Sequence, residues 1–156
     1  MSVIFLPLLM GIVAGLRTMT APAALAVGAR YGLIRVAGTP LAFMGYTWTP
    51  WILCALAVGE LITDQLPTTP SRKTPVPFAA RIVSGALAGA TLAAAQGSLV
   101  TGVIVGIVGA VIGTLGGAAF RARLAAVFGK DPPAALIEDA VAIGAATLIV
   151  LAAAHI

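Results

Sequence analysis

The sequence predicts an all-α bundle of membrane-spanning helices, and two observations support this fold class. Of the 156 residues, 60% are hydrophobic and only 9% are charged, and the mean hydropathy is +1.09. A soluble domain has about a quarter of its residues charged. The chain also contains several apolar runs close to the roughly 20 residues that cross a bilayer. We therefore predict a single integral membrane domain over residues 1–156, in contact with lipid and without a soluble catalytic domain.

The first half of the chain predicts two spans. Residues 3–29 form an apolar run that is longer than one crossing needs and contains Pro22, so we expect this helix to be tilted, kinked or broken. The mixed residues 30–49 are expected to connect the spans at the membrane surface. Thr49 and Pro50 are typical of a helix start, and the second span is predicted to extend to residue 66. The nearby aromatic residues are typical of an interfacial belt: Tyr46, Trp48 and Trp51.

The second half predicts three more spans. The stretch PTTPSRKTPVP, residues 67–77, is too rich in proline to continue a helix and is expected to form a polar turn. A third span follows over residues 77–96, and a Gly97-Ser98 turn leads into a fourth, uncharged span over residues 99–120. Asp131 is predicted to cap a fifth span that begins at Pro132-Pro133 and reaches residue 154. The expected total is five transmembrane helices.

The lysines and arginines predict the orientation of these spans. Arg30 and Arg35 would lie on one side of the membrane. Cytoplasmic loops carry an excess of positive charge, so the N-terminus is predicted to be cytoplasmic and the C-terminus outside. Because the basic residues lie in short turns, the net charge of +4 reflects topology, and no nucleic-acid partner is expected. The more basic side would hold Arg72, Lys73, Arg81, Arg121, Arg123 and Lys130.

Glycine spacing predicts how the helices pack. G-x-x-x-G spacing places two glycines on one helix face, where a neighbouring backbone can approach closely. Packing within one chain is the favoured interpretation over a dedicated dimer face. Small side chains fill little volume, however, so some of these faces are expected to meet a second copy in a homo-oligomer. The pairs are Gly11/Gly15, Gly85/Gly89, Gly102/Gly106 and Gly109/Gly113.

Two pairs of segments also suggest an internal repeat. GIVAGLRTMTAPAA from Gly11 aligns with GIVGAVIGTLGGAA from Gly106, and ALAVG from Ala55 aligns with AVAIG from Ala140. With the third span between them, the two pairs would enter the membrane from opposite sides. Such an inverted two-helix repeat occurs in many transporters.

Charged residues inside the spans are the candidate functional residues. Arg17 and Glu60 both fall near the predicted midplane, where an unpaired charge costs at least about 2.5 to 3.5 kcal/mol. We expect them to pair with each other or to face a wet cavity. Thr18 and Thr20 are expected to satisfy backbone groups freed by Pro22 or to present hydroxyls to a ligand.

A second polar layer is predicted nearer the cytoplasmic side. Asp64 is one turn beyond Glu60, and Arg81 falls early in the third span. Glu138 and Asp139 fall early in the fifth. These residues would either line a cytoplasmic vestibule or, as end-of-span residues, reach the headgroups and hold helices together.

Other chemistries have less support. His155 is the only histidine, so no His-containing metal cluster or catalytic triad is available, and neither a metal nor a cofactor is expected. The accompanying arginines argue against a carboxylate cage for cations. The TTPSRK segment offers Ser71 and Arg72 as a candidate anion site, since it resembles the Ser-Arg elements of membrane lipid phosphatases.

The motifs that contain these residues carry a family resemblance. GLRTMTAPAA, GELITDQLPTTPSRKTP, ARIVSGALAGA and IEDAVAIG together resemble a family of small bacterial multi-span inner-membrane proteins, described only as a domain of unknown function. The resemblance covers nearly the whole chain and implies a bacterial inner-membrane location, but it supplies no activity. It singles out Arg17, Glu60, Asp64, Pro67, Ser71, Arg72, Arg81, Glu138 and Asp139.

The sequence therefore predicts a protein that moves a small solute or ion, and not an enzyme. Arg17 would contact an anion, and Glu60 and Asp64 would act as gating or proton-coupled carboxylates. A non-transporting structural or lipid-binding protein is the alternative, in which the same charges only hold helices together. An enzyme acting on a lipid phosphate is the third possibility.

Overall fold

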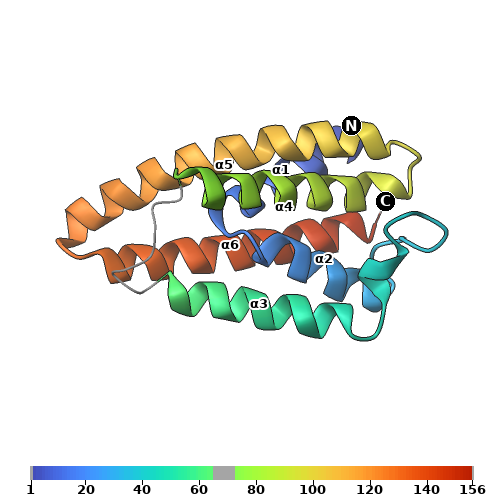
Figure 1. Cartoon of the computed structure of the whole chain (residues 1–156), viewed down its shortest axis with the longest axis horizontal. Helices are drawn as coiled ribbons and strands as arrows, with labels where there is room; N and C mark the ends of the chain where they lie inside the picture. Colours follow the sequence, from blue (N-terminus) through green and yellow to red (C-terminus); the bar gives the residue numbers. More distant parts are fainter. Residues whose placement is uncertain (1, 65–72, 156) are drawn as a thin grey trace.

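A computed structural model describes residues 2–64 and 73–155, and every regular element in this part of the chain is helical (Figure 1). The prediction of an all-α fold is therefore confirmed for the described residues. The order is α1 (Ser2–Leu16), α2 (Thr20–Arg30), the 3-10 helix η1 (Ala42–Gly45), α3 (Thr49–Thr63), α4 (Pro75–Ala94), α5 (Leu99–Phe128) and α6 (Asp131–Ala153).

The helices α4, α5 and α6 are each long and apolar enough to cross a membrane. The other two apolar helices, Ile4–Leu16 and Thr49–Thr63, are shorter than a full crossing. A membrane location agrees with these lengths and compositions. The expected number of five spans stays a prediction.

The first apolar run is divided into two helices that form a hairpin. Helix α1 ends at Leu16, α2 begins at Thr20, and α2 returns toward the end of the molecule where α1 begins (Figure 1). Leu6 of α1 and Leu33, just beyond α2, accordingly line one pocket together with Ala153. The sequence predicted that this run could be broken, and it is; the two parts fold back on each other instead of continuing in one direction. We refer to residues 17–19, between the two helices, as the hairpin tip.

Pro22 does not cause this break directly. It is the third residue of α2, and the first backbone hydrogen bond that closes this helix runs from the Ala23 N–H to the Met19 carbonyl. The first N–H groups of any helix have no intrahelical acceptor, so a proline here removes no helical hydrogen bond. The proline marks the start of the second helix, and the break lies before it.

A seam of glycines joins α1, α4 and α5. Gly11 and Gly15 of α1 meet the backbone of α5 around Gly106 and Gly113. Beside α1, a Cβ added to Gly85 of α4 would also lie only 2.6 Å from the Gly106 carbonyl oxygen. Larger side chains would hold these backbones apart. All of the predicted glycine pairs are used in this way, which confirms the expectation of packing within one chain; homo-oligomer formation stays a prediction.

The direction of α1 and α5 does not support the predicted inverted repeat. Gly11 of α1 lies against Gly106, and Gly15 lies further along α5 against Ala110 and Thr114. Later residues of one helix therefore meet later residues of the other, so α1 and α5 run parallel. Segments related by an inverted repeat would run in opposite directions. The sequence similarity between them reflects a shared need for glycine at the seam.

Helix α5 continues beyond the end predicted from the sequence. The uncharged run stops at Phe120, but the helix extends to Phe128 and ends at Gly129, whose φ of 65° lies in the left-handed region that glycine adopts readily. Arg121 and Arg123 are therefore helical residues and not part of a turn. This extension brings Arg121 close to the start of α6.

Helix α3 is the least embedded helix of the bundle. It packs mainly against α2 and η1, and Pro50 is its one buried residue. Several of its large apolar side chains are exposed, including Trp51, Leu56 and Ile62. Its far end is attached to the bundle by charged groups, which form the candidate site.

Candidate functional site

Glu60 of α3 caps the hairpin tip. The N–H groups of Thr18 and Met19 donate to the two carboxylate oxygens of Glu60, at 2.8 Å to Oε1 and 2.7 Å to Oε2. These donors stand at the start of α2, which lacks a side-chain cap of its own. A helix N-terminus carries partial positive charge and unsatisfied N–H groups, so it binds a carboxylate favourably. Glu60 therefore supplies from another helix the cap that the local sequence does not provide.

Arg17 joins two helices that are distant in sequence. Its side chain is 0% exposed, and its guanidinium forms ion pairs with Asp64, directly after α3, and with Asp139 of α6. The sequence-based pairing of Arg17 with Glu60 is therefore wrong in its partner. The physical reason is that the Glu60 carboxylate is already held by backbone N–H groups, whereas Asp64, one turn further on, reaches the guanidinium.

Arg81 of α4 supports the tip from the opposite side. Its Nε donates to the Gly15 carbonyl at 3.1 Å, which satisfies a carbonyl in the last turn of α1, and its Nη2 lies 3.9 Å from Glu60 Oε1. The hydroxyl group of Ser84, one turn further along α4, donates a hydrogen bond to the Thr18 carbonyl. A cation near a helix C-terminus and an anion near a helix N-terminus are both favourable. The tip thus has its two helix ends neutralised by groups from α3 and α4.

Arg121 of α5 extends the cluster toward the end of the bundle. Its Nη1 lies 3.6 Å from Glu138 Oε2, its Nε donates to Asp131 Oδ1 at 2.9 Å, and its Nη2 donates to the Asp64 carbonyl at 3.4 Å. From the sequence, Arg121 was expected only to indicate topology and Asp131 only to cap the last helix. In the structure Asp131 is the first residue of α6, and its carboxylate accepts from Arg121. The signal that could have paired them is their ten-residue separation, which fits two positions facing each other across a helical hairpin. Using this signal requires knowing that α5 continues past Phe120.

The structure brings most of the predicted site residues together. We define the charge cluster as Arg17, Glu60, Asp64, Arg81, Arg121, Asp131, Glu138 and Asp139. Thr18 contributes its backbone to the cluster. Thr20 directly follows the tip and lines an apolar groove. Ser71 and Arg72, the predicted loop anion site, and Pro67 lie outside the described residues.

Burial within the cluster is graded. The Arg17 and Glu138 side chains are 0% and 1% exposed, whereas the Glu60 and Asp64 side chains keep 14% and 15% of their surface exposed. The Nε of Arg17 is buried and has no hydrogen-bond acceptor among the described residues. Leaving a buried donor unsatisfied costs about 1–3 kcal/mol. The arginine is therefore held tightly, yet one of its donors remains available to a further acceptor.

Most of the cluster lies inside the bundle, and Asp131, with its side chain 57% exposed, is at the surface. Arg81 is six residues into α4 and Asp139 eight residues into α6, or about 9 and 12 Å from the helix starts at 1.5 Å per residue. Charges at such depth need partners, because an unpaired charge in a low-dielectric region costs several kcal/mol. No group of three or more His, Cys, Asp or Glu side chains suited to a metal ion occurs in residues 2–64 and 73–155.

Comparison with protein-family models, curated proteins and solved structures finds no match to this chain. The geometry of the hairpin tip and of the charge cluster is therefore the basis for a functional assignment.

Proposed function

We propose that this protein moves a small solute or ion across a membrane, and that the hairpin tip with its charge cluster is where the permeating species binds. The observation that carries the proposal is a pair of helices that meet, with an unwound backbone between them, at a buried arginine and several carboxylates. Non-helical backbone at membrane depth is tolerated where it is enclosed by protein or lines a water-filled cavity. Many transporters bind substrate and coupling ions at such discontinuous helices.

The two ends of the break offer opposite electrostatic environments. The α1 end presents carbonyl groups beside Arg81, and the α2 start presents N–H groups that hold Glu60. Arg17 lies between them with its Nε available. A small anion that displaced the Glu60 carboxylate would find the same N–H groups and nearby guanidinium groups. Glu60 would then act as a resident anion that the permeating species replaces.

Protonation of Glu60 is the proposed coupling step. A neutral carboxylic acid binds a helix N-terminus and an arginine less well than a carboxylate does. Glu60 and Asp64 hold one end of α3 to the tip, and α3 otherwise packs mainly against α2 and η1. Loss of the negative charge would loosen this end of α3 and open the cluster on its more exposed side.

The hairpin changes the orientation that we propose for the membrane. Because α1 and α2 return to the same end, the N-terminus lies at the end opposite Lys73, Arg121, Arg123 and Lys130. The excess of basic residues places that basic end in the cytoplasm. We therefore propose that the start of α1 and the end of α6 both face away from the cytoplasm, which reverses the N-terminal side predicted from the sequence.

Cysteine labelling in intact cells tests this orientation. In a Cys54→Ala background, we expect an impermeant thiol reagent to label Ala37→Cys and to leave Arg123→Cys unlabelled. Both positions are exposed in the folded chain, so access to the reagent decides the result. The opposite labelling pattern would contradict the proposed orientation without bearing on transport itself.

Transport can be tested in liposomes that contain the purified protein. We expect a concentration step in protons, potassium, sodium, chloride, phosphate or acetate to produce a protein-dependent current on a solid-supported membrane for at least one of these probes. The Glu60→Gln variant should lose proton dependence of that current. The matched control is Arg123→Gln, which removes an exposed charge outside the cluster and should behave like the parent.

Two outcomes would count against the proposal. Currents with identical proton dependence in the parent and Glu60→Gln would remove Glu60 from the coupling step. A second outcome is that no probe produces a current and that Glu60→Gln and Arg17→Met change only thermal stability. That result would favour a structural role, in which the charges only hold the helices together.

A further inference from the structure

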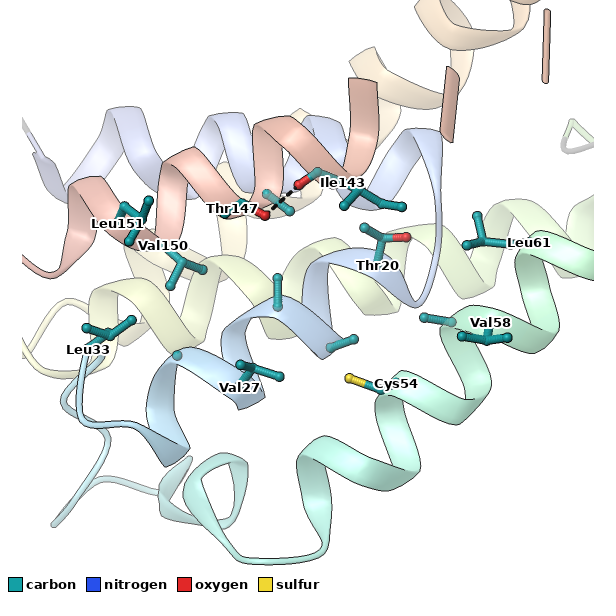
Figure 2. Close-up of a pocket in the computed structure, with 15 residues that line it drawn as sticks. Thr20, Val27, Leu33, Cys54, Val58, Leu61, Ile143, Thr147, Val150 and Leu151 are labelled. Atoms are coloured by element: carbon teal, nitrogen blue, oxygen red, sulfur yellow. Dashed lines mark hydrogen bonds between the residues drawn. The ribbon is translucent and has the colours of Figure 1, made fainter. Parts of the chain in front are cut away.

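A long apolar groove lies between α2, α3 and α6 (Figure 2). One end begins at Thr20 and Leu61, beside the charge cluster, and the groove extends from there toward the opposite end of the bundle. Its volume is about 400 Å³, within the range of roughly 300–1,000 Å³ that small-molecule sites occupy. Figure 2 shows Val27 of α2, Val58 of α3 and Val150 of α6 around it. The one threonine hydroxyl on the α6 wall, Thr147, donates to the Ile143 carbonyl at 2.9 Å, so it presents no free donor to the groove.

The dimensions of the groove suit an extended alkyl chain. Along α2 its lining extends from Thr20 to Gly28, and along α6 from Ile143 to Leu151. Eight residues of helix rise about 12 Å, which is close to half of the roughly 30 Å hydrocarbon core of a bilayer. The groove therefore runs parallel to the helices over about one leaflet.

One end of the groove leads into a second, more polar pocket. Val27 and Cys54 line both cavities, so the two are adjacent. The second pocket has a volume of about 520 Å³, and its lining includes Arg30, Tyr31 and Trp51. Tyrosine and tryptophan are enriched at the level of lipid headgroups, and arginine binds phosphate with charge-assisted hydrogen bonds.

The charge of Arg30 is not neutralised by a carboxylate side chain. The five aspartate and glutamate residues of the chain, at positions 60, 64, 131, 138 and 139, all lie in the charge cluster toward the opposite end of the bundle. Arg30 is exposed at the last turn of α2. An apolar groove beside a pocket lined by this arginine, a tyrosine and a tryptophan is complementary to an amphipathic anion.

We propose that this groove binds an anionic phospholipid, with an acyl chain along α2, α3 and α6 and the phosphate at Arg30. The bound lipid fills the space beside α3, the least embedded helix, and links it to α6. This site is separate from the charge cluster, and the proposal does not depend on transport.

Cys54, the one cysteine of the chain, provides a native reporter because it points across the groove toward α2 (Figure 2). The experiment measures the rate at which N-ethylmaleimide modifies Cys54 in protein that has been stripped of lipid in detergent. Mixed micelles then supply phosphatidylglycerol or phosphatidylcholine with identical acyl chains. We expect phosphatidylglycerol to slow the modification at about tenfold lower concentration than phosphatidylcholine, because a charge-assisted phosphate contact without a compensating headgroup cation favours the anionic lipid.

The variants separate the headgroup from the groove. Arg30→Gln should remove the preference for phosphatidylglycerol, whereas Arg35→Gln, an exposed arginine at the same end that lines a different pocket, should retain it. Arg30→Lys, which keeps the charge, should retain part of the preference and provides a second variant if Arg30→Gln does not fold. The proposal would be overturned by equal protection of Cys54 by both lipids, by no protection from either lipid, or by an unchanged preference in Arg30→Gln. It would also be overturned if the protection of Cys54 depended on protein concentration instead of lipid concentration. The last result would assign the groove to a second copy of the chain.

Discussion

The two arms of the hairpin have different surroundings. Helix α1 lies in the glycine seam, where the backbones of α1, α4 and α5 approach one another closely. Helix α2 lies beside the apolar groove and packs against the weakly embedded α3. The arms also differ in composition: α1 is rich in leucine, isoleucine and valine, whereas five of the eleven residues of α2 are alanine. The surroundings differ because the helices next to α1 offer glycines for close packing, whereas α3, next to α2, leaves the space of the groove.

This difference divides the bundle into a fixed part and a part that can move. Close backbone packing tolerates little displacement, because a shift of a glycine face brings backbones into collision. Helix α3 has room beside it, and one of its ends is held to the bundle by the ionised side chains of Glu60 and Asp64. A change in charge at the tip would therefore act on α3 before it acts on the seam.

The largest expected effect is at Arg17, where the two arms meet. Arg17→Met should lower the free energy of unfolding in detergent by about 3–5 kcal/mol, because it leaves two buried carboxylates without their partner. Combining it with Asp139→Asn should recover part of the loss. The control is Arg17→Met with Glu60→Gln, which should recover less, since the Glu60 carboxylate is held by the Thr18 and Met19 N–H groups. If Glu60→Gln recovered more stability than Asp139→Asn, the result would support the pairing of Arg17 with Glu60 that the sequence predicted.

A smaller loss is expected in the glycine seam. Gly106→Ala places a Cβ against the backbones of Gly85 and Gly89 and should cost about 1–3 kcal/mol of unfolding free energy through overpacking. Gly116 is on the same helix with no neighbouring atom near its added Cβ, so Gly116→Ala should be neutral or stabilise by up to about 1 kcal/mol. Melting temperatures of the two variants, measured side by side in one detergent, check this contrast. Equal shifts would show that α1, α4 and α5 are not in close backbone contact.

The smallest effect is expected on the groove side. Ala57 of α3 lines the apolar groove and is only half-buried. Ala57→Leu adds volume where space is available, so its unfolding free energy in detergent should stay within about 0.5 kcal/mol of the parent. Denaturant unfolding measures this change. A loss as large as that of Gly106→Ala would mean that the groove is closed by packing and that the two arms are equally fixed.

Several features could be predicted from the sequence because they depend on local composition. The helical character and the apolar helices follow from long runs without charge, and the use of the glycine pairs in packing follows from their spacing. Charges in apolar runs must find partners, which is why Arg17, Glu60, Asp64, Arg81, Glu138 and Asp139 were expected to have polar partners, and they lie together in the structure. Each of these inferences needs only the cost of placing a residue type in an apolar surrounding.

Only the tertiary structure decided the path of the chain and the choice of partners. The hydropathy of the 27 residues from 3 to 29 is compatible with a single crossing and with a hairpin, since both arrangements bury the same side chains. The hairpin exists because groups distant in sequence satisfy its unwound tip: Glu60 for the N–H groups, Arg81 for the Gly15 carbonyl, and Ser84 for the Thr18 carbonyl. For the same reason Arg17 pairs with Asp64 and Asp139 instead of Glu60. A hydrogen bond depends on atomic positions within a few tenths of an ångström, and spacing along one helix does not fix those positions between helices.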